Sequence, residues 1–291
     1  MIITKLMGGL GNQMFQYALG KSLAINNSDK LKIDRAEYKT YKLHNYGLGV
    51  FNLNESFADK KECDEIRFEK CTIVERIVRR MLGKMRRKTN NYVAEKSFRF
   101  DSEILKLTGN KYLEGYWQSE KYFVLFKEEI RANFTLKHEM NEANAEMYKK
   151  ITGINSVSFH IRRGDYVSDS KTKAYHGVDL KQYYADAIIL IKEKVKNPYF
   201  FIFSDEPKWV IENFKGEFNF TVVDCNSGKT GYEDMRLMSA CKHNIIANSS
   251  FSWWGAWLNN NPGKIVTAPK NWFTDKSIDT TDLIPETWER L

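Results

Sequence analysis

The sequence is poor in cysteine and has no long apolar run, and each shortage excludes a class of protein. Its 291 residues include four cysteines, with neither a C-x-x-C pair nor a histidine at zinc-site spacing. A metal site built on them is therefore not expected, and we interpret them as buried thiols. No apolar stretch reaches the length of a membrane span, and the first residues carry no signal-peptide pattern. These absences predict a cytoplasmic protein.

Two nucleotide-handling motifs are also absent. The sequence has no D-x-D, the arrangement with which many metal-dependent sugar-nucleotide enzymes hold their cation. It has no G-x-x-x-x-G-K-S/T either, which excludes a Walker A loop. We therefore expect no metal site, and any phosphate to be bound by arginines and backbone N–H groups.

The composition is that of a folded protein with an excess of positive charge. Hydrophobic residues make up 42% and aromatic residues 14%, which is typical of globular chains. The length suits one large domain or two of ordinary size. The net charge of +8 comes from 45 Lys and Arg against 37 Asp and Glu, and it suggests anionic partners.

Much of this excess charge lies in Arg76–Lys88, which has seven positive charges and no negative one. Apolar residues recur there at roughly helical spacing, which predicts a basic amphipathic helix. One interpretation is a solvated surface helix with a stripe that faces the core. The other is peripheral contact with an anionic membrane surface, at the inner face of the membrane. Nucleic acid is disfavoured, because no aromatic residues are interleaved with the charges.

The second half of the chain alternates between strands and helices. Strands are predicted over 156–162, 199–205, 220–224, 243–248 and 264–269, and helices over 180–195, 232–241 and 250–259, with Pro207 at a further helix start. Strands at such intervals, apolar on both faces, predict a parallel, doubly wound sheet with helices on each side. We therefore expect a Rossmann-like domain over residues 154–291.

The first half, residues 1–153, is less regular. A strand over 2–6, a turn formed by GGLGNQ, a helix over 14–24 and a strand over 31–34 predict an α/β start. A helical insertion over 58–110 precedes a strand near 112–115 and helices near 121–133 and 140–150. We place the domain boundary near 152–155, where Gly153 breaks the helical pattern.

The segment SVSFHIRRGDYV combines a strand with charged residues at its end. Val157, Phe159 and Ile161 alternate with polar residues, and two arginines then enter a turn. Ligands of open α/β sheets bind outside the carboxyl ends of the strands. The fork of N–H donors on Arg162 suits a phosphate or pyrophosphate, with Asp165 able to brace one arginine. The alternative is an Arg–Asp pair that only ties a loop.

Gly8–Gln13 lies between a strand and a helix, the position of a loop that approaches a phosphate or another ligand. It is similar to the dinucleotide fingerprint, with Asp34 where a ribose-binding acid would lie. However, Met14 occupies the third glycine position of that fingerprint. A tight turn without a ligand is the alternative. The candidate ligand-binding residues are Gly9, Gly11, Asn12 and Gln13.

Further candidates follow later strands of the second half. Ser249 or Ser250 can cap the helix that begins there, which would place hydroxyl and backbone N–H groups on the anion bound by Arg162. The segment 204–209 ends its strand at the same sheet edge. Acidic residues at 233–234 favour a helix start. The ligand-binding candidates are His160, Arg162, Ser204, Asp205, Asp234, Asn248, Ser249, Ser250 and Phe251.

Four segments together resemble one family. GGLGNQMFQYALG, HIRRGDYV, SDEPKW and NSSFSWWGAWL occur in the order of the motifs of α-1,2-fucosyltransferases, glycosyltransferase family 11. The resemblance spans nearly the whole chain. It implies a GT-B-like fold of two Rossmann-like domains facing a cleft, with the N-terminal one on the acceptor side. It also implies GDP-fucose as donor, no metal requirement, and inverting transfer to the 2-hydroxyl of a galactoside.

The donor half of this family is similar to α-1,6-fucosyltransferases and protein O-fucosyltransferases. That similarity implies that Arg162 grips the β-phosphate with His160 beside it, and that Ser249 and Ser250 form the serine pair of the donor site. An aspartate fifteen residues before the pair binds guanine, and by the same count it is Asp234. The candidate catalytic residues are Arg162, His160 and Asp165. The base stays open between His160, Asp165, Asp169 and an acid of the N-terminal half.

Two alternatives belong to other classes of protein. One is a non-catalytic phosphate- or nucleic-acid-binding protein that uses the basic surface. The other is a dinucleotide-dependent oxidoreductase built on GGLGNQ. On the fucosyltransferase hypothesis the acceptor is a galactose-terminated oligosaccharide or a lipid-linked glycan, and the sequence does not choose between them.

Overall fold

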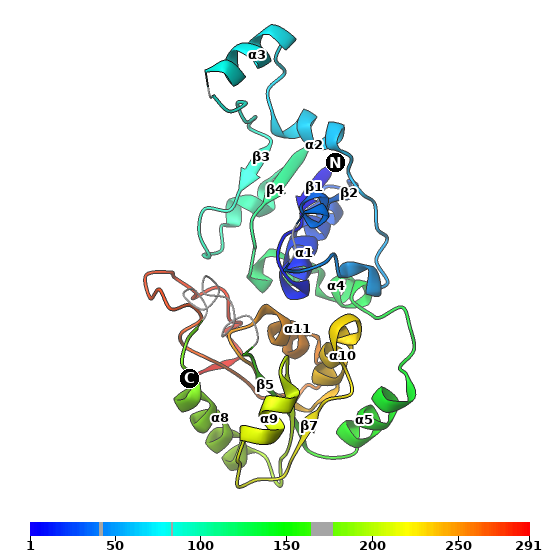
Figure 1. Ribbon diagram of the computed structural model, residues 1–291, viewed down its shortest axis with the longest axis vertical. Helices are drawn as coiled ribbons and strands as arrows, with labels where there is room; N and C mark the ends of the chain where they lie inside the picture. Colours follow the sequence, from blue (N-terminus) through cyan, green and yellow to red (C-terminus); the bar gives the residue numbers. More distant parts are fainter. Residues whose placement is uncertain (41–42, 83, 164–176) are drawn as a thin grey trace. The chain divides into compact units, whose positions relative to one another are not determined.

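The computed structural model describes residues 1–40, 43–82, 84–163 and 177–291. These residues form two compact units, Met1–Leu136 and Lys137–Leu291 (Figure 1). Within the described ranges no helix is long and apolar enough to cross a membrane. The division lies before the boundary predicted near 152–155, because helix α5 (Glu142–Thr152) packs on the second unit, where Ile151 shares a core with Phe201 and Phe203.

The second unit is built on a six-stranded sheet in the order β10-β9-β8-β5-β6-β7, with parallel pairing at every step. Its strands are β5 (Ser156–Ile161), β6 (Tyr199–Ser204), β7 (Phe220–Val223), β8 (His243–Ile245), β9 (Val266–Ala268) and β10 (Glu289–Arg290). Its other helices are α8 (Lys181–Lys194), α9 (Pro207–Asn213), α10 (Tyr232–Ala240), α11 (Ser250–Leu258) and the 3₁₀ turn η6 (Gly228–Thr230). The predicted parallel sheet is confirmed, and β10 is an additional edge strand.

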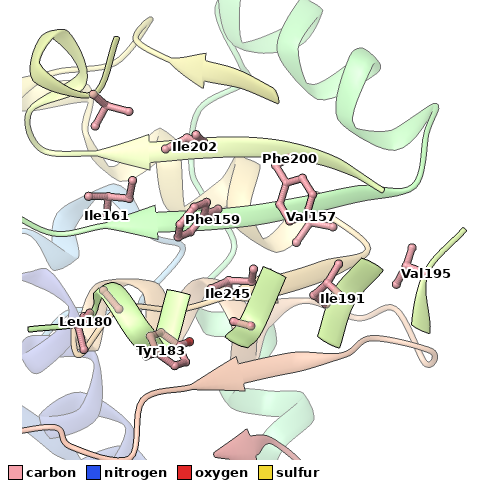
Figure 2. Packing of buried hydrophobic residues seen from close by; sticks show 13 residues of the cluster. Val157, Phe159, Ile161, Leu180, Tyr183, Ile191, Val195, Phe200, Ile202 and Ile245 are labelled. Carbon is pink, nitrogen blue, oxygen red and sulfur yellow. The ribbon is translucent and has the colours of Figure 1, made fainter. Parts of the chain in front are cut away.

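Strand β6 lies between two cores, which explains its almost continuous apolar sequence. Phe200 and Ile202 pack in the core that includes α8, while Phe201 and Phe203 pack in the core that includes α5 and α10. Figure 2 shows the first of these cores between β5, β6 and α8. Successive side chains of a strand point to opposite faces, so a strand covered on both faces needs apolar residues throughout.

The first unit has a four-stranded sheet in the order β2-β1-β4-β3, again with parallel pairs. Its strands are β1 (Ile2–Lys5), β2 (Leu31–Asp34), β3 (Tyr92–Ala94) and β4 (Lys111–Glu114). Its helices are α1 (Leu10–Asn26), α2 (Lys60–Arg67), α3 (Ile73–Met81) and α4 (Lys127–Asn133). Its 3₁₀ turns are η1 (Ala36–Lys39), η2 (Leu48–Val50), η3 (Ser102–Lys106), η4 (Glu120–Tyr122) and η5 (Val124–Phe126).

Several expectations for the first unit need correction. The insertion predicted as helical over 58–110 also supplies β3, which extends the sheet beside β4. The helix predicted near 121–133 is two 3₁₀ turns followed by α4. Helix α1 begins at Leu10, so most of the predicted GGLGNQ turn is the first turn of that helix. Propensity alone does not reveal a short edge strand whose pairing partner lies elsewhere in the chain.

The basic helix predicted over 76–88 is shorter than expected. Helix α3 starts at a capping box in which the Thr72 hydroxyl accepts from the Glu75 N–H, and it ends at Met81. Residues 84–88, the rest of the predicted helix, are not helical. The sequence has a glycine at position 83, and glycine is among the poorest helix formers.

Candidate active site

Arg162 lies at the carboxyl end of the central strand and is held by a carboxylate from the neighbouring strand. Ile161 of β5 pairs with Ser204 of β6, so Arg162 and Asp205 leave the sheet side by side. Arg162 Nη1 donates to Asp205 Oδ2 at 2.9 Å, and the backbone N–H of Arg163 donates to Asp205 Oδ1 at 3.0 Å. One carboxylate therefore fixes both the guanidinium and the backbone that carries it.

Arg163 is held separately, against α9. Its Nε donates to Glu206 Oε2 at 3.2 Å, and its guanidinium carbon lies 3.5 Å from the centre of the Trp209 ring. The backbone N–H of Glu206 in turn donates to Ser204 Oγ at 3.1 Å. These contacts give Arg163 a structural role at the start of α9. Asp165, predicted as the brace and as a catalytic residue, lies outside the described residues, as does Asp169.

His160 precedes Arg162 on β5, and its imidazole is buried, with 3% of the residue exposed. Its Nδ1 has no hydrogen-bond partner in the part of the chain that the structure describes. Burial, and next the charge of Arg162, lower the pKa of His160 to about 3, with Asp205 acting in the opposite direction. The imidazole is therefore neutral at ordinary pH and is a weak proton acceptor.

The N-terminus of α11 approaches β5 from strand β8, which pairs with β5. Ser249 caps the helix, with its Oγ accepting from the Phe251 N–H at 3.3 Å, and the Phe251 ring lies 6.2 Å from that of His160. Ser250 is the first helical residue and is partly exposed. The buried Asn248 donates from Nδ2 to Trp272 O at 3.0 Å. The positive end of the helix dipole therefore lies at the sheet edge that carries Arg162.

Asp234 lies in the first turn of α10, after β7. Its Oδ1 accepts from Asn226 Nδ2 at 2.8 Å, and Asn226 forms a reciprocal amide pair with Asn144 of α5. Burial raises the pKa of Asp234 to about 7, a rise that the hydrogen bond from Asn226 opposes and the charge of Glu233 supports. Sequence reasoning missed both asparagines, because nothing local marks an amide pair formed between residues so far apart in the chain.

The candidates of the second unit thus collect at one edge of its sheet. The ends of β5, β6 and β8 bring together His160, Arg162, Ser204, Asp205, Ser249 and Phe251. Asp234 follows β7, the strand beside β6. Among the described residues no three His, Cys, Asp or Glu side chains are grouped as a metal site would require. The arrangement offers a guanidinium, a capped helix start and a separate, half-buried carboxyl group.

In the first unit, Gln13 joins the Gly8 loop to its neighbours. Gly8 has a φ of +75°, and its carbonyl accepts from Gln13 Nε2 at 3.0 Å and from the Tyr38 hydroxyl at 2.7 Å. Gln13 Nε2 also donates to Asn45 O at 2.9 Å, and its Oε1 accepts from the Gly47 N–H at 2.8 Å. These bonds give Gln13 a structural role in the loop, and its expected ligand contact stays a prediction.

The other candidates of that loop lie around the start of α1. Gly9 is the N-cap residue and provides no side-chain cap, and Gly11 is buried in the first turn. Asn12 Oδ1 accepts from Gln118 Nε2 at 2.7 Å, which connects the loop after β1 to the loop after β4. These three positions remain candidate ligand contacts.

The carboxylate of Asp34, the expected ribose-binding acid, accepts hydrogen bonds from within the protein. Its Oδ2 accepts from the Tyr112 hydroxyl at 2.6 Å, and its Oδ1 accepts from the Ala36 N–H at 2.9 Å. Only 8% of the residue is exposed. A dinucleotide ribose would have to displace these bonds, so the geometry argues against the oxidoreductase alternative.

A strained loop follows β4 in the same unit, and sequence reasoning missed it. Glu95 accepts the backbone N–H groups of Tyr116 at 2.7 Å and Trp117 at 2.9 Å. Burial raises the pKa of Glu95 although these two donors oppose the rise. Trp117 has a φ of +56°, and strain of this kind in a residue other than glycine is concentrated at functional sites. In the described part of the chain, the buried Gln118 Oε1 has no partner.

Comparison with known proteins identifies what the chain is similar to. Residues 1–290 match the family model described as glycosyl transferase family 11. The chain is 38% identical to an alpha-1,2-colitosyltransferase of Escherichia coli, over 100% of this chain and 98% of that protein. It is 26% identical to the galactoside alpha-(1,2)-fucosyltransferase 1 of Mus musculus, over 86% of this chain and 61% of that protein.

The fold has a counterpart among solved structures. The NodZ alpha-1,6-fucosyltransferase co-crystallized with GDP matches with a TM-score of 0.51 and 17% identity, over 87% of this chain and 90% of that one. At this level of identity the likeness concerns the fold. Together with the two parallel-sheet units it confirms the predicted α/β fold of the GT-B class.

Proposed function

Because the chain belongs to glycosyltransferase family 11, we propose that it is an inverting galactoside α-1,2-fucosyltransferase. The proposed donor is GDP-β-L-fucose, and the acceptor is the 2-hydroxyl of a galactose residue in an oligosaccharide or a glycan repeat unit. The observation that carries the proposal is Arg162 at the end of β5, fixed by Asp205 at 2.9 Å. The name of the mouse relative, a galactoside alpha-(1,2)-fucosyltransferase, supports fucose as the sugar and a galactoside as the acceptor.

In the proposed reaction Arg162 stabilises the departing GDP. The bond between fucose C1 and the β-phosphate oxygen breaks, C1 forms a bond to the acceptor oxygen from the opposite side, and the hydroxyl proton passes to a base. Negative charge grows on the diphosphate as the bond breaks, so a fixed guanidinium stabilises the transition state more than the ground state. The N-terminus of α11 adds to this field, and we propose that no metal ion takes part.

Asp234 is the proposed guanine contact. An ionised carboxylate can accept both N–H donors of the guanine edge, whereas adenine presents no matching pair. Asn226 and Asn144 fix the carboxyl group for this task. His160, with a pKa of about 3, is too weak a base to take the hydroxyl proton, so we propose that its neutral ring packs beside the diphosphate. Asp165 stays a prediction for the base.

A second donor is favoured by one observation, the 38% identity to a colitosyltransferase. Colitose is fucose without its 3-hydroxyl group. A site that hydrogen-bonds that hydroxyl would discriminate strongly against colitose, whereas a site that merely has room for the hydroxyl would accept both sugars.

The experiment that tests the proposal supplies GDP-fucose and GDP-colitose separately with a β-galactoside and determines the product linkage by NMR. We expect an α-1,2-fucosylated galactoside, formed faster than the colitosyl product, and transfer by Arg162→Ala that is slower by about 10²- to 10³-fold or more. Faster transfer of colitose would change the donor. If neither sugar is transferred while the protein binds NAD, the oxidoreductase alternative would replace the proposal.

A further inference from the structure

Helix α3 exposes an apolar face. The exposed fractions are 75% for Ile73, 69% for Val74, 50% for Ile77, 47% for Val78 and 82% for Met81. At 100° per residue these five side chains fall within an arc of about 140° on one side of the helix. Leu82 and Met85 continue the exposed apolar surface, at 61% and 87%. The apolar stripe that was expected to face a core is therefore exposed, and none of the described residues covers it.

The opposite side of α3 and the residues after it are cationic. By the same count Arg79 lies opposite the apolar arc and Arg80 at its edge beside Ile73, and Lys84 and Arg87 follow the helix. Arg86 is engaged with Asp64 at 3.1 Å. The acid of this stretch, Glu75, lies in the first turn, where it accepts from the backbone N–H and the hydroxyl of Thr72. The segment thus combines an apolar face with net positive charge.

This segment is held at its base by backbone pairing. The Glu69 N–H donates to Arg87 O and the Thr89 N–H donates to Arg67 O, both at 3.0 Å, around an antiparallel bridge between Phe68 and Lys88. Both ends of the α3 segment, residues 72–86, are therefore fixed at one place on the first unit. Figure 1 draws α3 (cyan) apart from the sheet of its own unit.

We propose that the α3 segment docks the protein on a membrane surface that carries anionic lipid. The exposed Ile, Val and Met side chains would enter the boundary between headgroups and acyl chains, while the arginines and lysines contact the anionic headgroups. Charge decides between occupants, because a second copy of the same cationic segment would repel the first. The inference concerns a surface outside the proposed donor site and does not depend on the transfer reaction.

The test is co-sedimentation of the full-length protein with vesicles of phosphatidylcholine, alone or with about a third phosphatidylglycerol, at about 0.05 M and 0.5 M salt. We expect binding to the anionic vesicles at low salt that is at least about tenfold stronger than to neutral vesicles, and that salt weakens. Equal binding to both vesicles, or none to either, would overturn the proposal.

Two variants separate the apolar from the electrostatic contribution. Each should reduce vesicle binding about tenfold while leaving transfer to a soluble acceptor and thermal unfolding unchanged. The apolar variant is Val74→Asn, Ile77→Asn, Met81→Asn, and the charge variant is Arg80→Gln, Lys84→Gln, Arg87→Gln. The matched control removes the same charge from exposed positions of the second unit: Lys149→Gln, Lys181→Gln, Lys208→Gln.

The control variant should keep its vesicle binding. If it loses as much binding as the charge variant, net charge and not the α3 segment attracts the protein to lipid, and the proposal fails. Analytical ultracentrifugation tests the alternative that a second copy of the chain covers the apolar face of α3. A dimer of the native protein that the apolar variant dissociates, together with vesicle binding unchanged in that variant, would assign the apolar face to self-association.

Discussion

Asp205 connects the two strands on which the donor site is built. Its oxygens accept from the guanidinium of Arg162 and from the backbone of Arg163. Glu206, the next residue, contacts Arg163 on the α9 side. Two adjacent acids with the same charge therefore support different arginines, which makes them a matched pair for mutation.

We expect Asp205→Asn to lower kcat about 10- to 100-fold with the acceptor KM nearly unchanged, because the guanidinium loses the charge that fixes it while staying in the site. Glu206→Gln should cost only a few-fold, since Arg163 contacts no ligand in this account. Steady-state kinetics on both folded variants measure the difference. Equal losses in the two variants would show that Asp205 has no special role in positioning Arg162.

The raised pKa of Asp234 predicts pH-dependent donor binding. In the free protein this pKa is about 7, above the ordinary 3.8, so at pH 6 most molecules carry the neutral carboxyl group. Guanine binds the ionised form, so binding must release the proton. Donor affinity should therefore rise about tenfold from pH 6 to pH 8 and level off above it.

Calorimetry with GDP-fucose measures this affinity, because the terminal phosphate of GDP would itself titrate near pH 6. Asp234→Asn should bind weakly at pH 8 and show no change with pH, while keeping its thermal unfolding. Tight binding by that variant, or equal affinity of the native protein at pH 6 and pH 8, would remove Asp234 from the guanine site.

At the scale of elements, α10 and α11 pack closely against each other at a glycine. A Cβ on Gly255 of α11 would lie 2.9 Å from Met238 Cβ of α10, and a Cβ so close to the backbone of α10 cannot move away by rotation. Asp234 and Ser249 lie at the starts of these two helices. Their spacing therefore sets the separation of the groups proposed to hold guanine and diphosphate.

Gly255→Val should destabilise the protein by about 3 kcal/mol, because it overpacks this contact. Gly263→Val is the control, since a Cβ there meets only Asn261 Oδ1 at 3.8 Å in an exposed turn, and should cost less than about 1 kcal/mol. Urea unfolding gives both values. A Gly255→Val protein as stable as the control would mean that the two helices separate without cost.

The sequence predicts the second unit well, because its strands stand out as apolar or alternating runs and several of its helices have a visible start or end. Pro207 at the first position of α9 and Ser249 at the cap of α11 are examples. The first unit is harder to predict. Strand β3 has only three residues. The division between the units falls at 136–137, before α5, where the sequence has no glycine or proline to mark it.

Site residues can be predicted from the sequence where a charged residue type follows a strand, as at Arg162 and Asp205. They cannot be predicted where the role of a residue depends on a partner distant in the chain. Three such contacts join segments far apart in the chain: the bond that Arg162 donates to Asp205, the amide pair of Asn226 and Asn144 beside Asp234, and the bond that the Trp117 N–H donates to Glu95. Gln13 shows the reverse case, since a residue in a ligand-like motif is used to join loops.

At the scale of the whole molecule, we propose that protein groups alone supply the positive field at the leaving group. The proposed groups are Arg162 and the start of α11. We therefore expect full turnover in excess EDTA, measured as fucose transfer to a galactoside. A loss of activity that Mn²⁺ or Mg²⁺ restores would contradict this. The matching control is the dialysed protein with and without added Mg²⁺, for which we expect equal turnover.

The most direct test of the central claim is the transfer rate of Arg162→Lys, with Arg163→Lys as its neighbour control. Lysine keeps the charge but loses the planar fork that spans two phosphate oxygens. The account predicts that kcat for fucose transfer from GDP-fucose falls about 10²- to 10³-fold, a loss of about 3–4 kcal/mol, nearly as large as for Arg162→Ala. Arg163→Lys should lose only a few-fold. Turnover of folded Arg162→Lys within a few-fold of the native protein would mean that another group holds the leaving diphosphate.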